Sequence, residues 1–126
     1  MAREIIHTDR APSSPAWSQG VRAGDHVVVS GMVGVDVTTG QLAGETIQEQ
    51  TRQALANCLA VVEAAGGTAD DVVDVTVLLA DPEDFAGMNE AYASVFPTDP
   101  PARNTPRLGP TLPDIRVSVR MTAVLA

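Results

Sequence analysis

Two runs of β-branched residues, 27–29 and 72–79, stand on either side of a long amphipathic segment at residues 46–65. The runs favour strands, because β-branched side chains pack well on a pleated surface. The segment between them favours a helix, because its apolar residues recur at helical spacing. A chain with this alternation buries its helices against a sheet. The sequence therefore predicts helices layered on a β-sheet.

The flanking residues predict where the long helix begins and ends. Thr46 followed three residues later by Glu49 matches a capping box, and Gly66 with Gly67 supplies the stop. One face collects the residues expected in the core, namely Ile47, Thr51, Ala54, Leu55, Cys58, Val61, Val62 and Ala65. Cys58 lies on this stripe, so we interpret it as a small core residue rather than a nucleophile.

The N-terminal part of the chain predicts three strands. Residues 4–7 favour a short opening strand. The turn signal at Gly24-Asp25 then joins residues 17–22 and 26–30 into a hairpin. The second strand of this hairpin is apolar on both faces, which is typical of a central strand.

The C-terminal part predicts a second helix and two further strands. Asp81 caps this helix, Pro82 suits its first turn, and Pro97 ends it. Its expected buried side consists of Phe85, Met88, Tyr92 and Val95. Residues 103–108 favour a short strand, and residues 115–125 a long one with alternating apolar and polar positions.

The predicted order is β-β-β-α-β-α-β-β, an α+β fold with a mixed sheet and both helices on one face. The 126 residues suffice for one domain, 1–126. A single helical layer leaves the other face of so apolar a sheet uncovered. We therefore expect that face to be buried against another subunit.

Composition excludes several classes of protein. The net charge of −8 repels phosphate backbones, which disfavours a nucleic acid as partner. Cys58 is the only cysteine and fits a reducing compartment. No apolar run approaches the roughly 20 residues of a membrane helix, and the first residues lack the apolar core of a signal peptide. We expect a soluble, cytoplasmic protein without membrane association.

Arg103 stands out because it follows Pro100-Pro101-Ala102. A planar guanidinium holds a carboxylate through two parallel hydrogen bonds, so this arginine is a candidate anchor for a small organic acid. An ordinary surface arginine after a proline-rich loop is the alternative, and the spacing alone leaves both open.

Four groups of motifs occur in a fixed order along the chain. They are Ala11-Pro12 with Pro15-Ala16-Trp17-Ser18-Gln19-Gly20; Val29-Ser30-Gly31-Met32 with Thr39-Gly40; Gln50-Thr51-Arg52-Gln53-Ala54-Leu55-Ala56-Asn57 with Glu63-Ala64-Ala65-Gly66-Gly67; and Met88-Asn89-Glu90-Ala91-Tyr92 with Phe96-Pro97 and Pro101-Ala102-Arg103. Together they resemble the RidA/YjgF family, the reactive-intermediate (enamine/imine) deaminases. The likeness runs almost from end to end.

This resemblance implies a chorismate-mutase-like fold and a homotrimer whose sheets form a central barrel, with ligand clefts between subunits. It implies that Arg103 binds the substrate carboxylate and that Trp17 takes the place of a tyrosine that lines the cleft. It implies no metal and no organic cofactor. The chain departs from the family at the glutamate that positions the attacking water, because that position falls on Ser118. A serine holds water but is no useful base, and losing such a group costs about 10²–10⁴-fold in rate.

The sequence offers no other acidic residue or histidine at a position suited to the role of that glutamate, the positioning of the attacking water. Asp36 and Asp114 lie at turns, Glu90 is expected on the solvent side of the second helix, and His7 and His26 are single histidines on strands. The sequence shows no metal-ligand spacing and no phosphate-binding glycine loop.

The first hypothesis is a protein that binds a small carboxylate-bearing metabolite in an intersubunit cleft. Arg103 grips the acid, Trp17 and Tyr92 shape the cleft, and the backbone at Ser30 and Gly31 lines it beside Ser118. Its reaction is the hydrolysis of an enamine or imine to a keto compound and ammonia. The second hypothesis is a non-catalytic ligand-binding or regulatory subunit, so the sequence leaves open whether the protein is an enzyme. A third, endoribonuclease, conflicts with the charge of −8.

Overall fold

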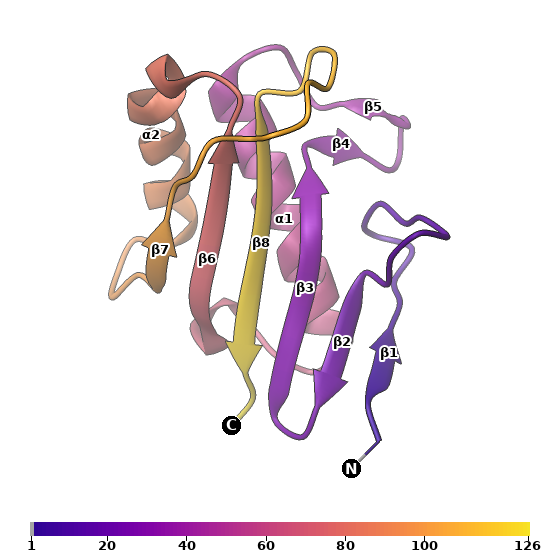
Figure 1. Ribbon diagram of the computed structural model, residues 1–126. Helices are drawn as coiled ribbons and strands as arrows, with labels where there is room; N and C mark the ends of the chain where they lie inside the picture. The colour runs from indigo at the N-terminus through magenta and orange to yellow at the C-terminus, as the bar shows by residue number, and fades with distance from the viewer. Residues whose placement is uncertain (1) are drawn as a thin grey trace.

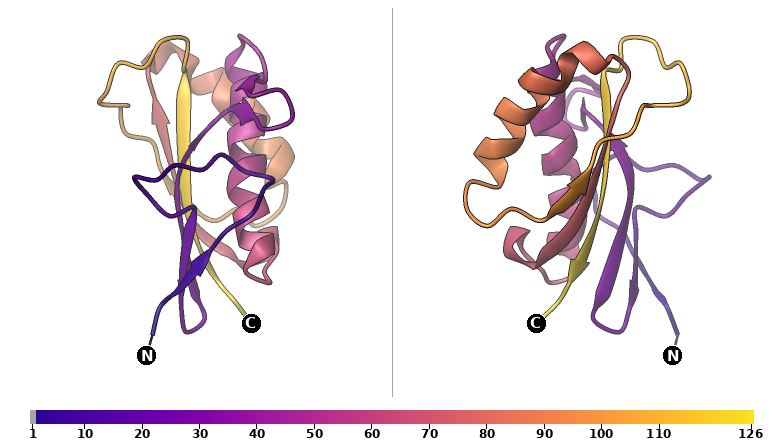
Figure 2. Two further views of the ribbon diagram at one scale, coloured as in Figure 1. Left: turned by 90° about the vertical axis from the view of Figure 1, so that its right-hand side faces the viewer. Right: turned by 60° about the vertical axis from the view of Figure 1, so that its left-hand side comes forward.

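The computed structural model describes residues 2–126 and has two layers, a β-sheet and two helices that cover one of its faces (Figure 1, Figure 2). The strands of the sheet are β1 (Glu4–Ile6), β2 (Gly20–Ala23), β3 (His26–Val33), β6 (Val72–Leu79), β7 (Ala102–Asn104) and β8 (Val117–Val124). The helices are α1 (Ile47–Ala64) and α2 (Phe85–Val95), with short 3₁₀ helices η1 (Ala69–Asp71) and η2 (Pro82–Asp84). A separate small hairpin contains β4 (Val35–Asp36) and β5 (Gln41–Leu42).

The strand order is β1-β2-β3-β8-β6-β7. All neighbouring pairs are antiparallel except β6 and β7, which are parallel, so the sheet is mixed as predicted. The predicted order of elements and the placement of both helices on one face are confirmed (Figure 2). The structure adds the small β4–β5 hairpin, which the sequence indicated only as a turn.

Strand β3 lies inside the sheet between β2 and β8, which confirms its predicted central place. Val27 and Val29 are fully buried on the helix side, whereas Val28 points to the other face and is 42% exposed. The reason is the alternation of side chains along a strand, which sends every second residue to each face. Only one face of this apolar run is therefore buried within a single chain.

Helix α1 begins and ends as predicted. The Thr46 hydroxyl accepts a hydrogen bond from the Glu49 backbone N–H, and the Glu49 carboxylate accepts one from the Thr46 N–H, which completes the capping box. Gly66 follows the helix with a φ of +97°, a left-handed conformation that glycine adopts without strain. All eight residues of the predicted apolar stripe are buried.

Cys58 is fully buried on that stripe, and its thiol donates a hydrogen bond to the Val119 carbonyl on β8 at 3.2 Å. Burial raises the pKa of this thiol, and the positive charge of Arg120 acts in the opposite direction as the smaller cause. The interpretation of Cys58 as a small core residue is confirmed.

Helix α1 packs directly on the backbone that follows β3. A Cβ atom on Gly34 would lie 2.6 Å from the carbonyl oxygen of Gln50, so no side chain fits there. The Gln50 side chain is buried, donates to the carbonyls of Gly44 and Asp114, and accepts from the Arg116 N–H. Gln50 therefore fixes the chain that leads into β8.

The predicted buried side of α2 is correct for Met88 and Tyr92 and wrong for Phe85. Met88 is fully buried and Tyr92 is 6% exposed, but Phe85 is 47% exposed. Phe85 is the first residue of the helix and lies at the edge of the sheet, where no further strand covers its ring. Val95 is half-buried.

The two C-terminal strands are shorter than predicted. Strand β7 ends at Asn104, although Arg107 forms one further parallel bridge to Leu79. The regular hydrogen-bond ladder between β7 and β6 stops after Asn104, because Pro106 lies between Asn104 and Arg107 and has no N–H to donate. Strand β8 begins at Val117 instead of residue 115.

In the part of the chain that the structure describes, residues 2–126, no helix covers the second face of the sheet (Figure 2). Ile5, Val21 and Val28 pair across β1, β2 and β3 and form an apolar row there, in which Ile5 is 51% exposed. Burial of this face against another subunit stays a prediction. Within residues 2–126, no helix is long and apolar enough to cross a membrane.

Candidate functional site

Arg103 lies on the edge strand β7, opposite the buried Val75 of β6. Paired residues on neighbouring strands point to the same side, so the Arg103 side chain lies on the helix side of the sheet, at α2. Its guanidinium carbon is 4.7 Å from the centroid of the Tyr92 ring and 5.8 Å from that of Phe85. Its Nη1 donates to the Met88 sulfur at 3.7 Å. We call Arg103, Tyr92, Phe85 and Met88 the arginine cluster.

The guanidinium of the arginine cluster has no anionic partner within the described residues 2–126. Among residues 2–126, the salt bridges formed by arginines are those of Arg10 with Glu63 and Arg116 with Asp84. The Met88 sulfur is only a weak acceptor, so most of the five donors of Arg103 are unpaired. A half-buried planar fork with unpaired donors matches the geometry of a carboxylate.

Tyr92 adds a second polar group without a partner. Its hydroxyl oxygen is buried and makes no hydrogen bond within the described residues. Burial raises the pKa of Tyr92, the positive charge of Arg103 opposes this, and the negative charge of Asp74 adds to it. The tyrosine therefore stays neutral, and its ring presents a π face to the guanidinium.

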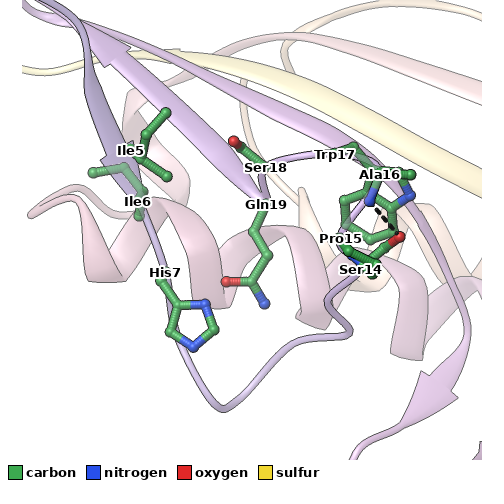
Figure 3. Close-up of a pocket in the computed structure, with 9 residues that line it drawn as sticks. All are labelled: Ile5, Ile6, His7, Ser14, Pro15, Ala16, Trp17, Ser18 and Gln19. Carbon is green, nitrogen blue, oxygen red and sulfur yellow. Dashed lines mark hydrogen bonds between the residues drawn. The ribbon is translucent and has the colours of Figure 1, made fainter.

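The second group of predicted site residues begins with residues 14–19, which we call the tryptophan loop. The loop lines a groove of about 430 Å³ together with Ile5, Ile6 and His7 (Figure 3). In Figure 3, Trp17 lies at one end of this groove and His7 at the other. The Trp17 side chain is 39% exposed, so its ring is available to a ligand or to another subunit.

Gln19 holds the tryptophan loop in place. It is 3% exposed, and its amide nitrogen donates to the carbonyls of Thr8, Ala11 and Pro12, while its oxygen accepts from the Thr8 N–H. These bonds fasten residues 8–12 to the start of β2. The amide therefore serves as a fixed support for the segment that carries Trp17.

A β-bulge in β3 joins the tryptophan loop to β8. Ser30 and Gly31 form the bulge, and the Ser30 hydroxyl donates to the Ser18 carbonyl. The Ser30 N–H donates to the Gln19 carbonyl at 2.9 Å. A Cβ atom on Gly31 would lie 3.2 Å from the Ser118 hydroxyl, so the backbone of the bulge passes close to that side chain. Bulges often redirect groups beside functional sites.

The structure brings the predicted residues together in two groups rather than one. Arg103 pairs with Val75, and Ser118 pairs with Leu78. Positions 75 and 78 are three apart on β6, so Arg103 and Ser118 point to opposite faces of the sheet. Arg103 and Tyr92 form one group; Trp17, Ser30, Gly31 and Ser118 form the other. No single chain surrounds one ligand with all six residues.

The remaining candidates lie on the surface. His7 and His26 are exposed and contact Asp9 and Asp25 at 3.3 and 2.8 Å. Asp36 accepts hydrogen bonds from the hydroxyl and N–H of Thr38, which lower its pKa. Glu90 and Asp114, the two remaining acidic candidates, are exposed. In the part of the chain that the structure describes, no three His, Cys, Asp or Glu side chains are grouped so that they could hold a metal ion.

Sequence reasoning missed two contributors to these groups. Phe85 was expected in the core but flanks Arg103, because periodicity does not show where a sheet ends. Gln19 was noted only as part of the motif Trp17-Ser18-Gln19. A buried glutamine beside a proline-rich loop could have indicated a support for backbone groups.

The chain is similar to known proteins over nearly its whole length. A family model described as Endoribonuclease L-PSP matches residues 8–125. A RutC family protein from Saccharolobus solfataricus is 41% identical over 122 residues, which is 96% of this chain and 97% of that protein. A 2-iminobutanoate/2-iminopropanoate deaminase from Rattus norvegicus is 37% identical over 123 residues, covering 97% of this chain and 90% of the relative.

The fold agrees with a solved structure as well. The crystal structure of TdcF from E. coli with bound serine superimposes with a TM-score of 0.90 at 33% identity. The match covers 98% of this chain and 99% of that one. The similarity therefore extends over the whole sheet and both helices.

Proposed function

Because this chain belongs to the Endoribonuclease L-PSP family, the RidA family, we propose that it binds a small carboxylate-bearing molecule through Arg103. The proposed site is a cleft between the subunits of a homotrimer. The proposed reaction is the hydrolysis of a 2-imino acid, or of the enamine that forms it, to a 2-keto acid and ammonia. The chain needs no cofactor for this chemistry.

The observation that carries the proposal is the unpaired guanidinium of Arg103. A half-buried cation without an anionic partner is costly unless a ligand neutralises it. The Tyr92 and Phe85 rings hold this cation in one place at the sheet edge, where its planar fork can donate hydrogen bonds to both oxygens of a carboxylate. The deaminase name of the Rattus norvegicus relative and the serine bound to E. coli TdcF agree with a small acid as ligand.

The separation of the two groups supports the proposed cleft between subunits. Arg103 and Ser118 point to opposite faces of the sheet, so a ligand held by Arg103 cannot reach the Ser118 of the same chain. A second copy whose tryptophan loop and bulge approach the arginine cluster would complete the site. The apolar row on the uncovered face supplies a surface for this association.

The reaction requires one water molecule. The water oxygen forms a bond to the imine carbon, the carbon–nitrogen bond breaks, and the nitrogen leaves as ammonia with the protons of the water. Arg103 holds the carboxylate beside the reacting carbon. Ser118 can orient the water by hydrogen bonds, but it has no basic strength, so the imine nitrogen itself takes up the proton. Slow turnover is the expected consequence.

A non-catalytic ligand-binding subunit is the second candidate, and Ser118 is the observation that favours it. In that case the protein binds a 2-keto acid and does not accelerate hydrolysis. Ribonuclease activity, which the family description names, is less compatible with a net charge of −8.

One experiment separates these functions. Imines are generated in situ from amino acids, and ammonia release is timed with the wild type, with Arg103→Ala and with Arg52→Ala, whose residue is exposed on α1. Calorimetry with 2-oxobutanoate measures binding in the same variants, and circular dichroism confirms their folding. Enzymatic function requires acceleration over buffer that Arg103→Ala removes and Arg52→Ala retains. Binding without acceleration supports the second candidate, and neither binding nor acceleration refutes both.

A further inference from the structure

A groove next to the arginine cluster is not used by the proposed carboxylate contact. It has a volume of about 520 Å³ and is lined by Leu79, Pro82, Phe85, Thr105, Pro106 and Arg107. Most of its lining is apolar, and the exposed Phe85 ring belongs both to the groove and to the arginine cluster. A ligand whose carboxylate lies on Arg103 can therefore extend past Phe85 into this groove.

Arg107 stands on the same side of the sheet as Arg103. Its partner in the parallel bridge is Leu79, and the partner of Arg103 is Val75. Both partners are buried on the helix side of β6, four residues apart. The two arginines are thus separated by about 13 Å along the strand direction. Arginine side chains are long enough to bring two guanidinium groups much closer together across Phe85.

Arg107 is also free of anionic partners. Within residues 2–126 it takes part in no salt bridge, and its residue is exposed at the rim of the groove. Asp81 and Asp84 are neighbours in sequence of the groove residues Pro82 and Phe85, but their carboxylates contact other groups. Asp81 accepts a hydrogen bond from the Glu83 N–H, and Asp84 pairs with Arg116 at 3.1 Å. The largely apolar groove consequently has the unpaired cation of Arg107 in its lining, and the unpaired guanidinium of Arg103 lies next to its Phe85 ring.

From this arrangement we propose that the ligand is a dicarboxylate, with one acid group on Arg103, the second on Arg107, and an aliphatic spacer against Phe85. This inference rests on the proposed function, because it takes Arg103 as the anchor of the first carboxylate. Charge complementarity selects the second anionic group, and the apolar lining selects a hydrocarbon spacer over a polar one. In the proposed reaction, the substrate is then the imine of a 2-keto dicarboxylic acid.

The test compares two keto acids with carbon chains of equal length, of which only one carries a second carboxylate. Calorimetry measures 2-oxoglutarate and 2-oxopentanoate with the wild type, Arg107→Ala, Arg103→Ala and the control Arg52→Ala. We expect 2-oxoglutarate to bind the wild type about tenfold or more tightly than 2-oxopentanoate, because a second charge-assisted contact forms. Arg107→Ala is expected to abolish this difference without weakening 2-oxopentanoate. Arg107→Lys should retain part of it, and added salt should reduce it.

The outcomes distinguish this inference from the function on which it rests. Equal affinity of the two acids for the wild type, or equal weakening of both by Arg107→Ala, overturns the dicarboxylate and leaves the Arg103 anchor intact. If Arg103→Ala binds both acids as well as the wild type does, or if neither acid binds the wild type, the proposed function fails and the inference fails with it.

Discussion

The guanidinium carbon of Arg103 lies 4.7 Å from the centroid of the Tyr92 ring, although one residue belongs to an edge strand and the other to a helix. The contact exists because β7 pairs in parallel with β6, which turns the Arg103 side chain toward α2. The ring limits the positions of a long, flexible side chain before any ligand arrives. Part of the entropy cost of binding is thereby met in advance.

The ring of Tyr92, rather than its hydroxyl, is predicted to support Arg103. Tyr92→Phe should bind 2-oxobutanoate like the wild type and lose no stability, because the hydroxyl makes no hydrogen bond within residues 2–126. Tyr92→Leu removes the cation–π contact, which is worth about 0.5–2 kcal/mol, so its dissociation constant should rise about 2- to 30-fold. Calorimetry checks both variants, and equal affinity of Tyr92→Leu and the wild type would contradict the prediction.

Ser118 is predicted to limit the hydrolytic rate. Ser118→Glu places a carboxylate on the same face, beside the backbone of Gly31, and supplies the missing base. Ammonia release from imines generated in situ should increase on the order of 10²–10⁴-fold over the wild type. Ser118→Gln is the matched control, because it has nearly the same shape without basic strength. Identical rates for the two variants would show that the acid–base group is not what the site lacks.

Gln19 is predicted to determine the position of Trp17, the only tryptophan in the chain. Gln19→Leu leaves the carbonyls of Thr8, Ala11 and Pro12 without their buried donor, so the unfolding free energy should fall by on the order of 2 kcal/mol. Acrylamide should then quench Trp17 fluorescence more strongly than in the wild type. Gln41→Leu, at an exposed position, serves as control. Unchanged quenching in Gln19→Leu would mean that the loop holds its shape without the amide.

The Cys58 thiol is predicted to lower the unfolding free energy of the protein as the pH becomes alkaline. Burial raises the pKa of its thiol, so above pH about 8.5 the unfolded chain loses a proton that the folded chain keeps. The unfolded state then binds fewer protons, and the unfolding free energy falls as pH rises, by up to about 1.4 kcal/mol per pH unit. Cys58→Ala should lack this decline. Urea denaturation of both proteins between pH 7 and 9.5 measures it, and parallel curves would rule the thiol out as the cause.

Local signals in the sequence determined much of the fold. The capping box at Thr46 and Glu49 and the glycine at position 66 defined the ends of α1, since such signals act over three or four residues. The periodicity of α1 and the β-branched run of β6 likewise reported which side chains are buried. These features depend on neighbours along the chain, and they are readable without the fold. The same holds for Arg103 as a candidate anchor, which its motif context indicated.

Only the tertiary structure decided how the candidate site residues are grouped. Arg103 meets Tyr92, and Ser118 meets Gly31, through strand pairings between segments far apart in the sequence. Those pairings also put Arg103 and Ser118 on opposite faces and left Phe85 at an uncovered edge. No local pattern encodes such relationships, because strand order and register are set by the packing of the whole sheet.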